Sequence, residues 1–448
     1  MAIVSKIVYP QLENRFDAEY YKPEYLEVER TIKNYPNKKA IGKLAEIVVN
    51  GTEIREYVPK GTPYLRVSDA REIFLDLSDV KYVRENVEVK KDIELDLNDL
   101  LFSRSGTIGV VGIVTEDIKG AIISSHLIRV KLRSINPYFA VVFFNSKYGI
   151  LQILRRNNGT VVPEINQPAL KSIVVPIPPP SSQEHIEKLV KEAHEKRKLA
   201  DQKYKEAEQL LYKELGIGKL ELTREKTFET TFSEVEKTTR FDSEYYQPKY
   251  DQNIENVRNS KFKNVKLGTL IEGIKYGTSE KVDYSESGIP FLRVTDINSF
   301  NTIDIEDIKR IPEYELQRVK NAIIRENEIL ISRTGTIGCA VYINEKLKNS
   351  IFGSYFIKIK VDKINPLYLS IFLNSQLGKL QTQRETSGAI QTNITIPIIK
   401  SLRIIVPDTE IQEKICDVYR DALQIRDASR RLIVQAKTEV EELIEKGR

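Results

Sequence analysis

A loop of hydroxyl, arginine and glycine residues occurs twice in the sequence, at residues 103–109 and 332–338. Glycines allow backbone N–H groups to turn toward an anion, hydroxyls add donors, and arginine offers a planar fork for phosphate or guanine. The candidate binding residues of the loops are Ser103, Arg104, Ser105, Thr107, Ser332, Arg333, Thr334 and Thr336. A tight turn whose arginine pairs with a carboxylate is an equally good interpretation, because glycine turns are common.

Sequence signals of catalysis are missing. Asn136-Pro137-Tyr138 lacks one proline of the amino-methyltransferase loop and is better explained as a helix cap. The glycines of residues 106–112 are not in dinucleotide-binding order, and Gly216-Ile217-Gly218-Lys219 is not a Walker loop. The serines, cysteines and histidines show neither a nucleophile–base pair nor zinc spacing. We therefore expect no catalytic residue, no metal site and no cofactor bound by this chain.

The overall charge is nearly balanced. The 448 residues include 69 Lys and Arg against 64 Asp and Glu, a net charge of +5. This is too small for a basic coat, so any nucleic-acid surface must be a local patch. The sequence has neither an apolar run of about 20 residues nor a signal-peptide pattern, and two cysteines cannot form a disulfide framework. We expect a cytoplasmic protein without a membrane partner.

The chain is an internal duplication. Residues 15–25 return as residues 240–250, an offset of 225, and the loop at 103–109 returns with an offset of 229. A period this long indicates two copies of a whole domain. The stretches between the shared motifs differ, because residues 70–99 barely resemble residues 297–328. Two copies of one scaffold with different surface stretches favour recognition of two different targets.

Each copy is predicted to be mixed α/β. Short β-branched runs predict strands at residues 121–131 and 172–176, and again at 351–361 and 401–407. Asn-Pro pairs at Asn136 and Asn365 predict helices that run to about Leu154 and Arg384. Arg66 and Arg293 each stand three residues before an aspartate, so we expect an internal Arg–Asp pair in each copy.

A long charged run without Gly or Pro follows each copy. Apolar residues recur there at steps of mostly three and four, which predicts two long helices with coiled-coil-like seams. Antiparallel packing of the two helices on each other, with a globular domain at either end, would bury both seams. The alternative, two separate surface helices, would leave the apolar stripes exposed to water. The predicted fold is α/β (α+β), with two tandem homologous domains separated by two long antiparallel coiled-coil helices. The predicted segments are residues 1–180, 181–216, 217–407 and 408–448.

The order of these motifs, present twice, resembles the specificity subunit of type I restriction–modification enzymes. The motifs are Arg-Phe-Asp-x-Glu-Tyr-Tyr, Pro-Tyr/Phe-Leu-Arg-Val-x-Asp, Ser-Arg-x-Gly-Thr-x-Gly and a proline-rich end leading into a long helix. The resemblance covers nearly the whole chain. It implies that residues 1–180 and 217–407 are target recognition domains, each reading one half of a split, asymmetric duplex DNA site, with the helices as spacer.

The resemblance also implies partners. Two modification (methyltransferase) subunits would dock on the chain, and restriction/translocase subunits would join for cleavage. S-adenosylmethionine, ATP and Mg would be bound by those partners, and this chain would be non-catalytic. The alternatives are the recognition subunit of a type II-like assembly and a coiled-coil adaptor between two proteins. The adaptor predicts no salt-dependent DNA affinity, unlike both restriction–modification hypotheses.

The resemblance further implies that base readout comes from loops and strands in the divergent stretches. These are residues 51–60, 66–75, 155–167, 277–286, 293–302 and 384–396. Arg, Lys, Asn and Gln side chains read base edges. The candidates of these types are Arg55, Lys60, Arg71, Asn157, Asn158, Lys281, Arg293, Gln391 and Asn393.

Overall fold

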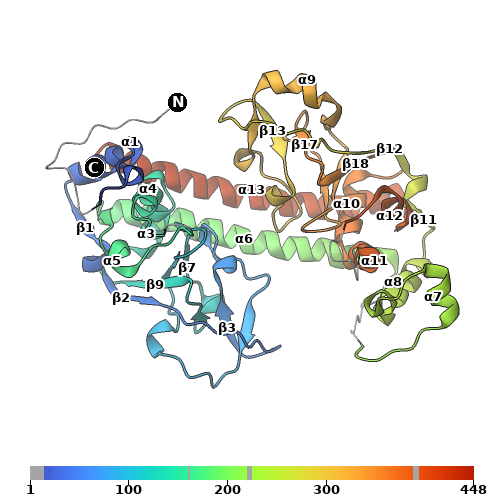
Figure 1. Ribbon diagram of the computed structural model, residues 1–448, viewed down its shortest axis with the longest axis horizontal. Coiled ribbons are helices and arrows are strands. Elements are labelled where there is room, and N and C mark those ends of the chain that lie inside the picture. Colours follow the sequence, from blue (N-terminus) through green and yellow to red (C-terminus); the bar gives the residue numbers. More distant parts are fainter. Residues whose placement is uncertain (1–14, 160–161, 219–224, 387–392, 448) are drawn as a thin grey trace. The chain divides into compact units, whose positions relative to one another are not determined.

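The computed structural model describes residues 15–159, 162–218, 225–386 and 393–447 (Figure 1). Its contacts divide the chain into two compact units. Unit 1 consists of Met1–Lys198 and Arg426–Arg448, and unit 2 of Leu199–Ile425. Each unit therefore contains one copy of the duplication and about half of each of two long helices, α6 (Pro180–Leu215) and α13 (Thr409–Glu445).

Unit 1 is built on a five-stranded sheet in the order β2-β9-β6-β7-β4. A three-stranded sheet, β5-β3-β8, and the pair β1-β10 accompany it. The strands are β1 (Lys38–Ala40), β2 (Ala45–Asn50), β3 (Thr62–Leu65), β4 (Ile73–Phe74), β5 (Lys81–Val83), β6 (Leu100–Ser103), β7 (Val111–Ile113), β8 (Ile122–Ile123), β9 (Leu127–Leu132) and β10 (Val174–Pro176). The helices besides the long ones are α1 (Pro23–Asn34), α2 (Ile41–Leu44), α3 (Pro137–Phe144), α4 (Lys147–Arg155) and α5 (Gln167–Lys171).

Unit 2 has a four-stranded sheet, β12-β18-β15-β16, a three-stranded sheet, β14-β13-β17, and the pair β11-β19. The strands are β11 (Asn264–Lys266), β12 (Ile271–Tyr276), β13 (Ile289–Leu292), β14 (Arg310–Ile311), β15 (Ile329–Ser332), β16 (Ala340–Tyr342), β17 (Ile351–Phe352), β18 (Phe356–Val361) and β19 (Arg403–Ile405). The helices are α7 (Phe232–Thr238), α8 (Pro248–Arg258), α9 (Leu316–Val319), α10 (Pro366–Asn374), α11 (Gln376–Thr386) and α12 (Ile396–Ser401).

The two units repeat one topology. The order β2-β9-β6-β7 in unit 1 matches β12-β18-β15-β16 in unit 2. In both three-stranded sheets one pairing is parallel, β3 with β8 and β13 with β17, and the other is antiparallel. The prediction of two tandem homologous domains of mixed α/β structure is confirmed.

The strands predicted at residues 121–131 and 351–361 are each two strands, so this prediction is wrong in detail. The Leu127 N–H donates to the Ser124 carbonyl at 3.0 Å, and the Phe356 N–H donates to the Gly353 carbonyl at 3.0 Å. These turns move the chain from the three-stranded sheet, through β8 and β17, into the larger sheet, through β9 and β18. A run of β-branched residues cannot show such a change of sheet.

The helices predicted to run to about Leu154 and Arg384 are each broken in two, at Asn145 and at Ser375. The second helix of each pair packs closely against the end of the first. A Cβ on Gly149 would lie 2.2 Å from the Phe143 carbonyl oxygen, and one on Gly378 would lie 2.4 Å from that of Leu373. Only glycine fits these close approaches.

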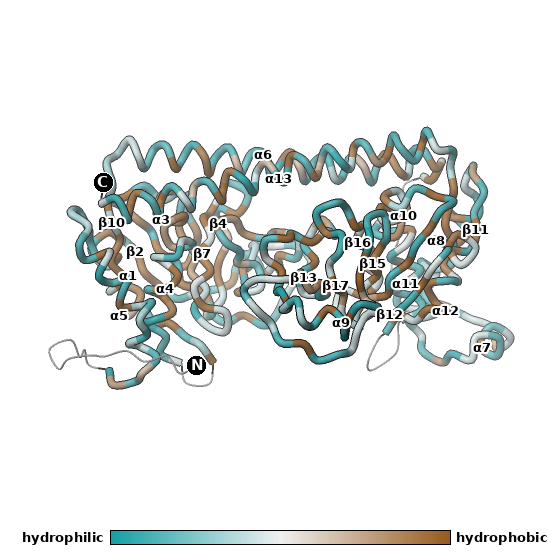
Figure 2. The backbone as a smooth tube through the Cα atoms, turned by 90° about the horizontal axis from the view of Figure 1, so that it is seen from above, coloured by the Kyte–Doolittle hydropathy of each residue, from teal (hydrophilic) through white to brown (hydrophobic). Residues whose placement is uncertain are grey.

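The long helices pack antiparallel within each unit. In unit 1 the Ser429 hydroxyl of α13 donates to the Ala193 carbonyl of α6 at 2.6 Å, and Ala193 shares one apolar core with Ala436 and Val440. Figure 2 shows hydrophilic and hydrophobic residues alternating along both helices.

In unit 2 the later part of α6 meets the early part of α13. Lys414 pairs with Glu214 at 2.9 Å, and the Tyr204 and Tyr419 rings lie 5.6 Å apart. Because early residues of one helix meet late residues of the other in both units, the predicted antiparallel seams are confirmed and the interpretation as separate surface helices is excluded.

A buried ion pair occupies the same place in both units with different residues. In unit 1 Arg129 of β9 donates through Nε to Asp99 Oδ2 at 2.7 Å. In unit 2 Lys358 of β18 lies 2.6 Å from Glu328 Oε1. Asp99 and Glu328 each precede the central strand, β6 or β15. All four charged side chains are buried, and each faces a side chain of opposite charge.

We expect Lys358→Met to lower the free energy of unfolding of unit 2 by about 3–5 kcal/mol, because Glu328 would stay buried without its cation. Urea denaturation at pH 7 measures this. The double variant Lys358→Met/Glu328→Gln is the control and should recover most of the loss, since glutamine still offers an acceptor to the Arg325 N–H, which lies 2.6 Å from Glu328 Oε2. Equal losses in the single and double variants would contradict the prediction.

Candidate nucleic-acid interface

The two Ser-Arg-x-Gly loops connect β6 to β7 in unit 1 and β15 to β16 in unit 2. Four of their glycines have positive φ angles: +82° at Gly106, +93° at Gly109, +68° at Gly335 and +79° at Gly338. Residues with side chains rarely adopt this left-handed region, so the glycines allow the turns. Each loop follows an apolar strand, β6 or β15.

The first serine of each loop is buried. Ser103 is 1% exposed and Ser332 is 0% exposed. The Ser103 hydroxyl accepts the Val110 N–H at 3.0 Å, and the Ser332 hydroxyl accepts the Cys339 N–H at 3.0 Å. Both hydroxyls close their own loop. The Ser332 hydroxyl also donates to the Thr336 carbonyl, so the prediction that Ser332 donates to a bound anion is corrected. Ser103 lines a pocket beside its loop, and its contact with an anion stays a prediction.

The arginines of the two loops have different partners. Arg104 Nη2 lies 2.5 Å from Glu164 Oε1, which is the carboxylate-paired arrangement that the sequence left open. Arg333 donates through Nη1 to the Ser354 carbonyl at 3.1 Å, and its guanidinium carbon lies 4.7 Å from the centre of the Tyr276 ring. The other predicted loop residues reach the surface: Ser105 and Thr334 are half-buried, and Thr107 and Thr336 are exposed.

A pocket of about 540 Å³ brings Arg71 together with Ser105 and Thr107 of the unit 1 loop. Arg71 donates through Nη1 to the carbonyls of Ser68 at 2.6 Å and Ala70 at 2.8 Å. These bonds hold the guanidinium against its own turn. The pocket therefore unites predicted residues from two separate parts of unit 1.

Arg293 forms the internal pair that the sequence predicts. Its Nη2 lies 2.6 Å from Asp296 Oδ1, and its backbone N–H donates to Asp296 Oδ2 at 2.8 Å. Arg66 and Asp69 repeat this arrangement in unit 1, with an Nη2–Oδ1 distance of 3.0 Å. The hydrogen bond to Asp296 raises the pKa of the Arg293 guanidinium above its ordinary value. Both bonds of Arg293 therefore stabilise the turn that leads to Asp296.

The remaining candidates take different positions. Asn157 shapes a turn, since its Oδ1 accepts the backbone N–H groups of Gly159 at 3.0 Å and Glu164 at 2.9 Å. Gln391 lies outside the described residues. The candidates with exposed side chains are Arg55, Lys60, Asn158, Lys281 and Asn393.

Sequence reasoning missed Glu164 and Tyr276. A signal for the first was available, because the offset of 229 aligns Glu164 with Asn393 and so marks a change of charge between the copies. Tyr276 is the last residue of β12, and its contact with a loop 57 positions further along the chain leaves no local pattern.

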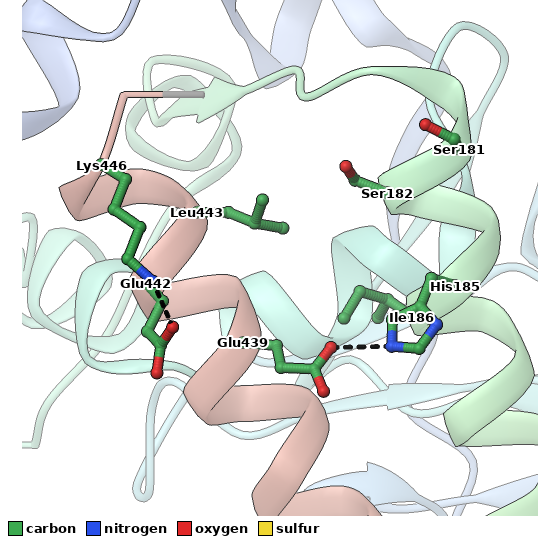
Figure 3. A pocket seen from close by; sticks show the side chains of 8 residues that line it. All are labelled: Ser181, Ser182, His185, Ile186, Glu439, Glu442, Leu443 and Lys446. Atoms are coloured by element: carbon green, nitrogen blue, oxygen red, sulfur yellow. Dashed lines mark hydrogen bonds and ion pairs between the residues drawn. The ribbon is translucent and has the colours of Figure 1, made fainter.

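A second pocket of unit 1, of about 340 Å³, lies between the start of α6 and the end of α13 (Figure 3). His185 Nε2 faces Glu439 Oε2 at 2.9 Å, and Lys446 pairs with Glu442 at 2.6 Å. Each basic side chain of this pocket faces a glutamate of the same pocket. It therefore offers no unpaired cation to an anion such as a DNA phosphate.

Both cysteines are buried, and burial raises the pKa of the Cys339 and Cys416 thiols to about 12. Neither thiol is therefore a thiolate nucleophile at neutral pH. Among the described residues, no group of three or more His, Cys, Asp or Glu side chains is arranged to hold a metal ion. No helix in the described ranges is long and apolar enough to cross a membrane.

Comparison with known proteins identifies the family. A family model described as "Type I restriction modification DNA specificity domain" matches residues 36–209 and 232–431. The chain belongs to this family. The two matches fall one in each copy of the duplication, so the chain carries the specificity domain twice.

Individual relatives are distant. The type I restriction enzyme EcoBI specificity subunit of Escherichia coli is 26% identical over 142 residues, which span 31% of this chain and 30% of that protein. The type I S subunit of M. genitalium aligns over 92% of this chain and 95% of its own, at 14% identity and a TM-score of 0.42. The HsdS subunit of Thermoanaerobacter tengcongensis aligns over 92% and 95%, at 15% identity and a TM-score of 0.29. The family assignment rests on the family model.

Ser332→Ala tests the structural role of the buried hydroxyl. We expect it to lower the free energy of unfolding by about 1–3 kcal/mol, because the buried Cys339 N–H loses its acceptor. Thr336→Ala in the same loop changes an exposed side chain and should cost no more than about 0.5 kcal/mol. Urea denaturation of both variants measures the two free energies of unfolding. A Ser332→Ala protein as stable as the wild type would contradict the structural role and make the hydroxyl a candidate ligand donor again.

Proposed function

We propose that this chain is the DNA-recognition subunit of a type I restriction–modification complex, and that its two domains each read one half of a bipartite, asymmetric duplex site. The observation that carries the proposal is the match of the DNA specificity domain to both copies. The difference between residues 70–99 and residues 297–328 supports two different half-sites, because the divergent stretches stand between shared strands.

The long helices would set the distance between the half-sites. A 36-residue helix such as α6 is about 54 Å long at about 1.5 Å per residue. This length corresponds to about 16 base pairs at about 3.4 Å per base pair. The antiparallel packing of α6 and α13 within each unit supports a stiff spacer, since two packed helices resist bending better than one.

The chemistry would belong to partner subunits. Two modification subunits would bring S-adenosylmethionine to an adenine in each half-site, and restriction/translocase subunits would use ATP and Mg. The description of the matched family as a DNA specificity domain supports a non-catalytic role for this chain. A type II-like assembly would use the same recognition chain with one combined partner.

Deleting the gene should remove adenine methylation from a two-part asymmetric motif with a fixed gap, while other motifs keep theirs. The measurement is a base-modification map of the host genome with the gene intact and deleted. Re-expression of the intact chain is the control and should restore the motif. An unchanged map, in cells that express the modification subunits, would contradict the proposal.

The spacer role is tested by inserting four residues at facing positions of both α6 and α13. Four residues add about 6 Å, or about 2 base pairs, and keep the seams nearly in phase because a turn takes 3.6 residues. We expect the gap in the methylated motif to lengthen accordingly. Replacing four exposed residues at the same positions, without insertion, is the control. Retained methylation with an unchanged gap would overturn the spacer role.

A further inference from the structure

The duplication places the two loop arginines in the same backbone frame. The carbonyl of Arg104 accepts the N–H of Ile165 at 2.9 Å, and the carbonyl of Arg333 accepts the N–H of Ile394 at 3.2 Å. Any difference between the two guanidinium groups must therefore come from the side chains around them.

The two guanidinium groups also donate to equivalent backbone carbonyls, one in each unit. Arg104 Nη1 lies 3.3 Å from the Ser125 carbonyl oxygen, and Arg333 Nη1 lies 3.1 Å from that of Ser354. Ser125 and Ser354 are equivalent at the offset of 229. Both arginines thus start from equivalent positions, directly after the interior strands β6 and β15.

The charge around the two arginines differs. In unit 1 the residue before Ile165 is Glu164, whose carboxylate lies 2.5 Å from Arg104 and neutralises it. In unit 2 the equivalent residue is Asn393, which is exposed and carries no charge. Among the described residues, no carboxylate lies within 4 Å of the Arg333 guanidinium, so Arg333 keeps its full positive charge.

In unit 2 the arginine contacts an aromatic ring, whereas in unit 1 it contacts a carboxylate. The Tyr276 ring lies 4.7 Å from the guanidinium carbon of Arg333, a cation–π distance. Tyr276 is 42% exposed, and Tyr355, whose carbonyl accepts the Arg333 N–H at 2.8 Å, is 62% exposed. The ring fixes the guanidinium and leaves its charge unneutralised at a surface with two exposed tyrosines.

We propose that Arg333, held by Tyr276, binds a phosphodiester group of the DNA backbone, and that Arg104 does not. This inference rests on the proposed DNA-binding function and makes the two domains unequal. The Nε of Arg333 is buried without a partner and Nη1 already donates to Ser354. The side of the guanidinium that carries Nε is therefore closed to a base edge, and one Nη1 N–H is already used. The donors that remain, on Nη2 and the second N–H of Nη1, suit an oxygen of a phosphate.

The test measures binding of the assembled complex to duplex DNA as a function of salt. One duplex carries the motif from the methylation map and the other lacks it. Arg333→Gln should weaken binding to both duplexes by the same factor and lower the slope of log K against log salt by about 1, because one phosphate contact is lost. Asn393→Glu, which installs the carboxylate of unit 1, should do the same while leaving the arginine in place.

The matched control is the double variant Arg104→Gln/Glu164→Gln in unit 1, which removes an ion pair without changing net charge. Its salt slope should equal that of the wild type. A wild-type slope in both Arg333→Gln and Asn393→Glu, or a loss confined to the duplex with the motif, would overturn the phosphate contact while the proposed function stands. A wild-type complex without salt-dependent DNA binding would instead overturn the proposed function, and this inference with it.

Discussion

Burial of the apolar stripes on α6 and α13 is the interaction on which the rest of each unit depends. A helix of this length with an apolar stripe must be covered along all of it. In unit 1 the cover comes from the other long helix and from α3, whose residues share the core with Ile186 and Val440. Polar contacts fix the same junction, since the Asn136 N–H donates to Gln183 Oε1 at 2.9 Å, and the Asn365 N–H donates to Gln412 Oε1 at 2.8 Å in unit 2.

Periodic and local signals were enough to predict the duplication, the two long helices and the Arg–Asp turns. These features depend on neighbours a few residues apart or on a repeat visible in the sequence. The broken strands and helices were missed because hydrophobicity does not show where a chain changes sheets. In the candidate interface, the Arg104–Glu164 pair joins residues 60 positions apart, and the burial of Ser103 depends on how its loop folds back. Such contacts become visible only in three dimensions.

The two copies show where a change of charge is tolerated. The buried pairs Arg129–Asp99 and Lys358–Glu328 differ in both residues yet keep one positive and one negative charge. A buried charge without its partner is costly, so such pairs change together. At the surface, Glu164 and Asn393 differ by a whole charge beside an unchanged arginine. Surface charge is inexpensive to alter, and a recognition face can therefore diverge while its scaffold stays the same.

The division of the long helices between the units has a consequence for how the protein forms. Unit 2 is one continuous stretch, Leu199–Ile425, whereas unit 1 needs Arg426–Arg448 to complete a core that begins near the start of the chain. Ala436, Val440 and Ile444 pack in that core beside Ile186 and Ala193. During synthesis on the ribosome, unit 1 therefore cannot complete its core until Arg426–Arg448, which is translated after unit 2, has been made. Unit 2 can reach its native contacts before unit 1 does.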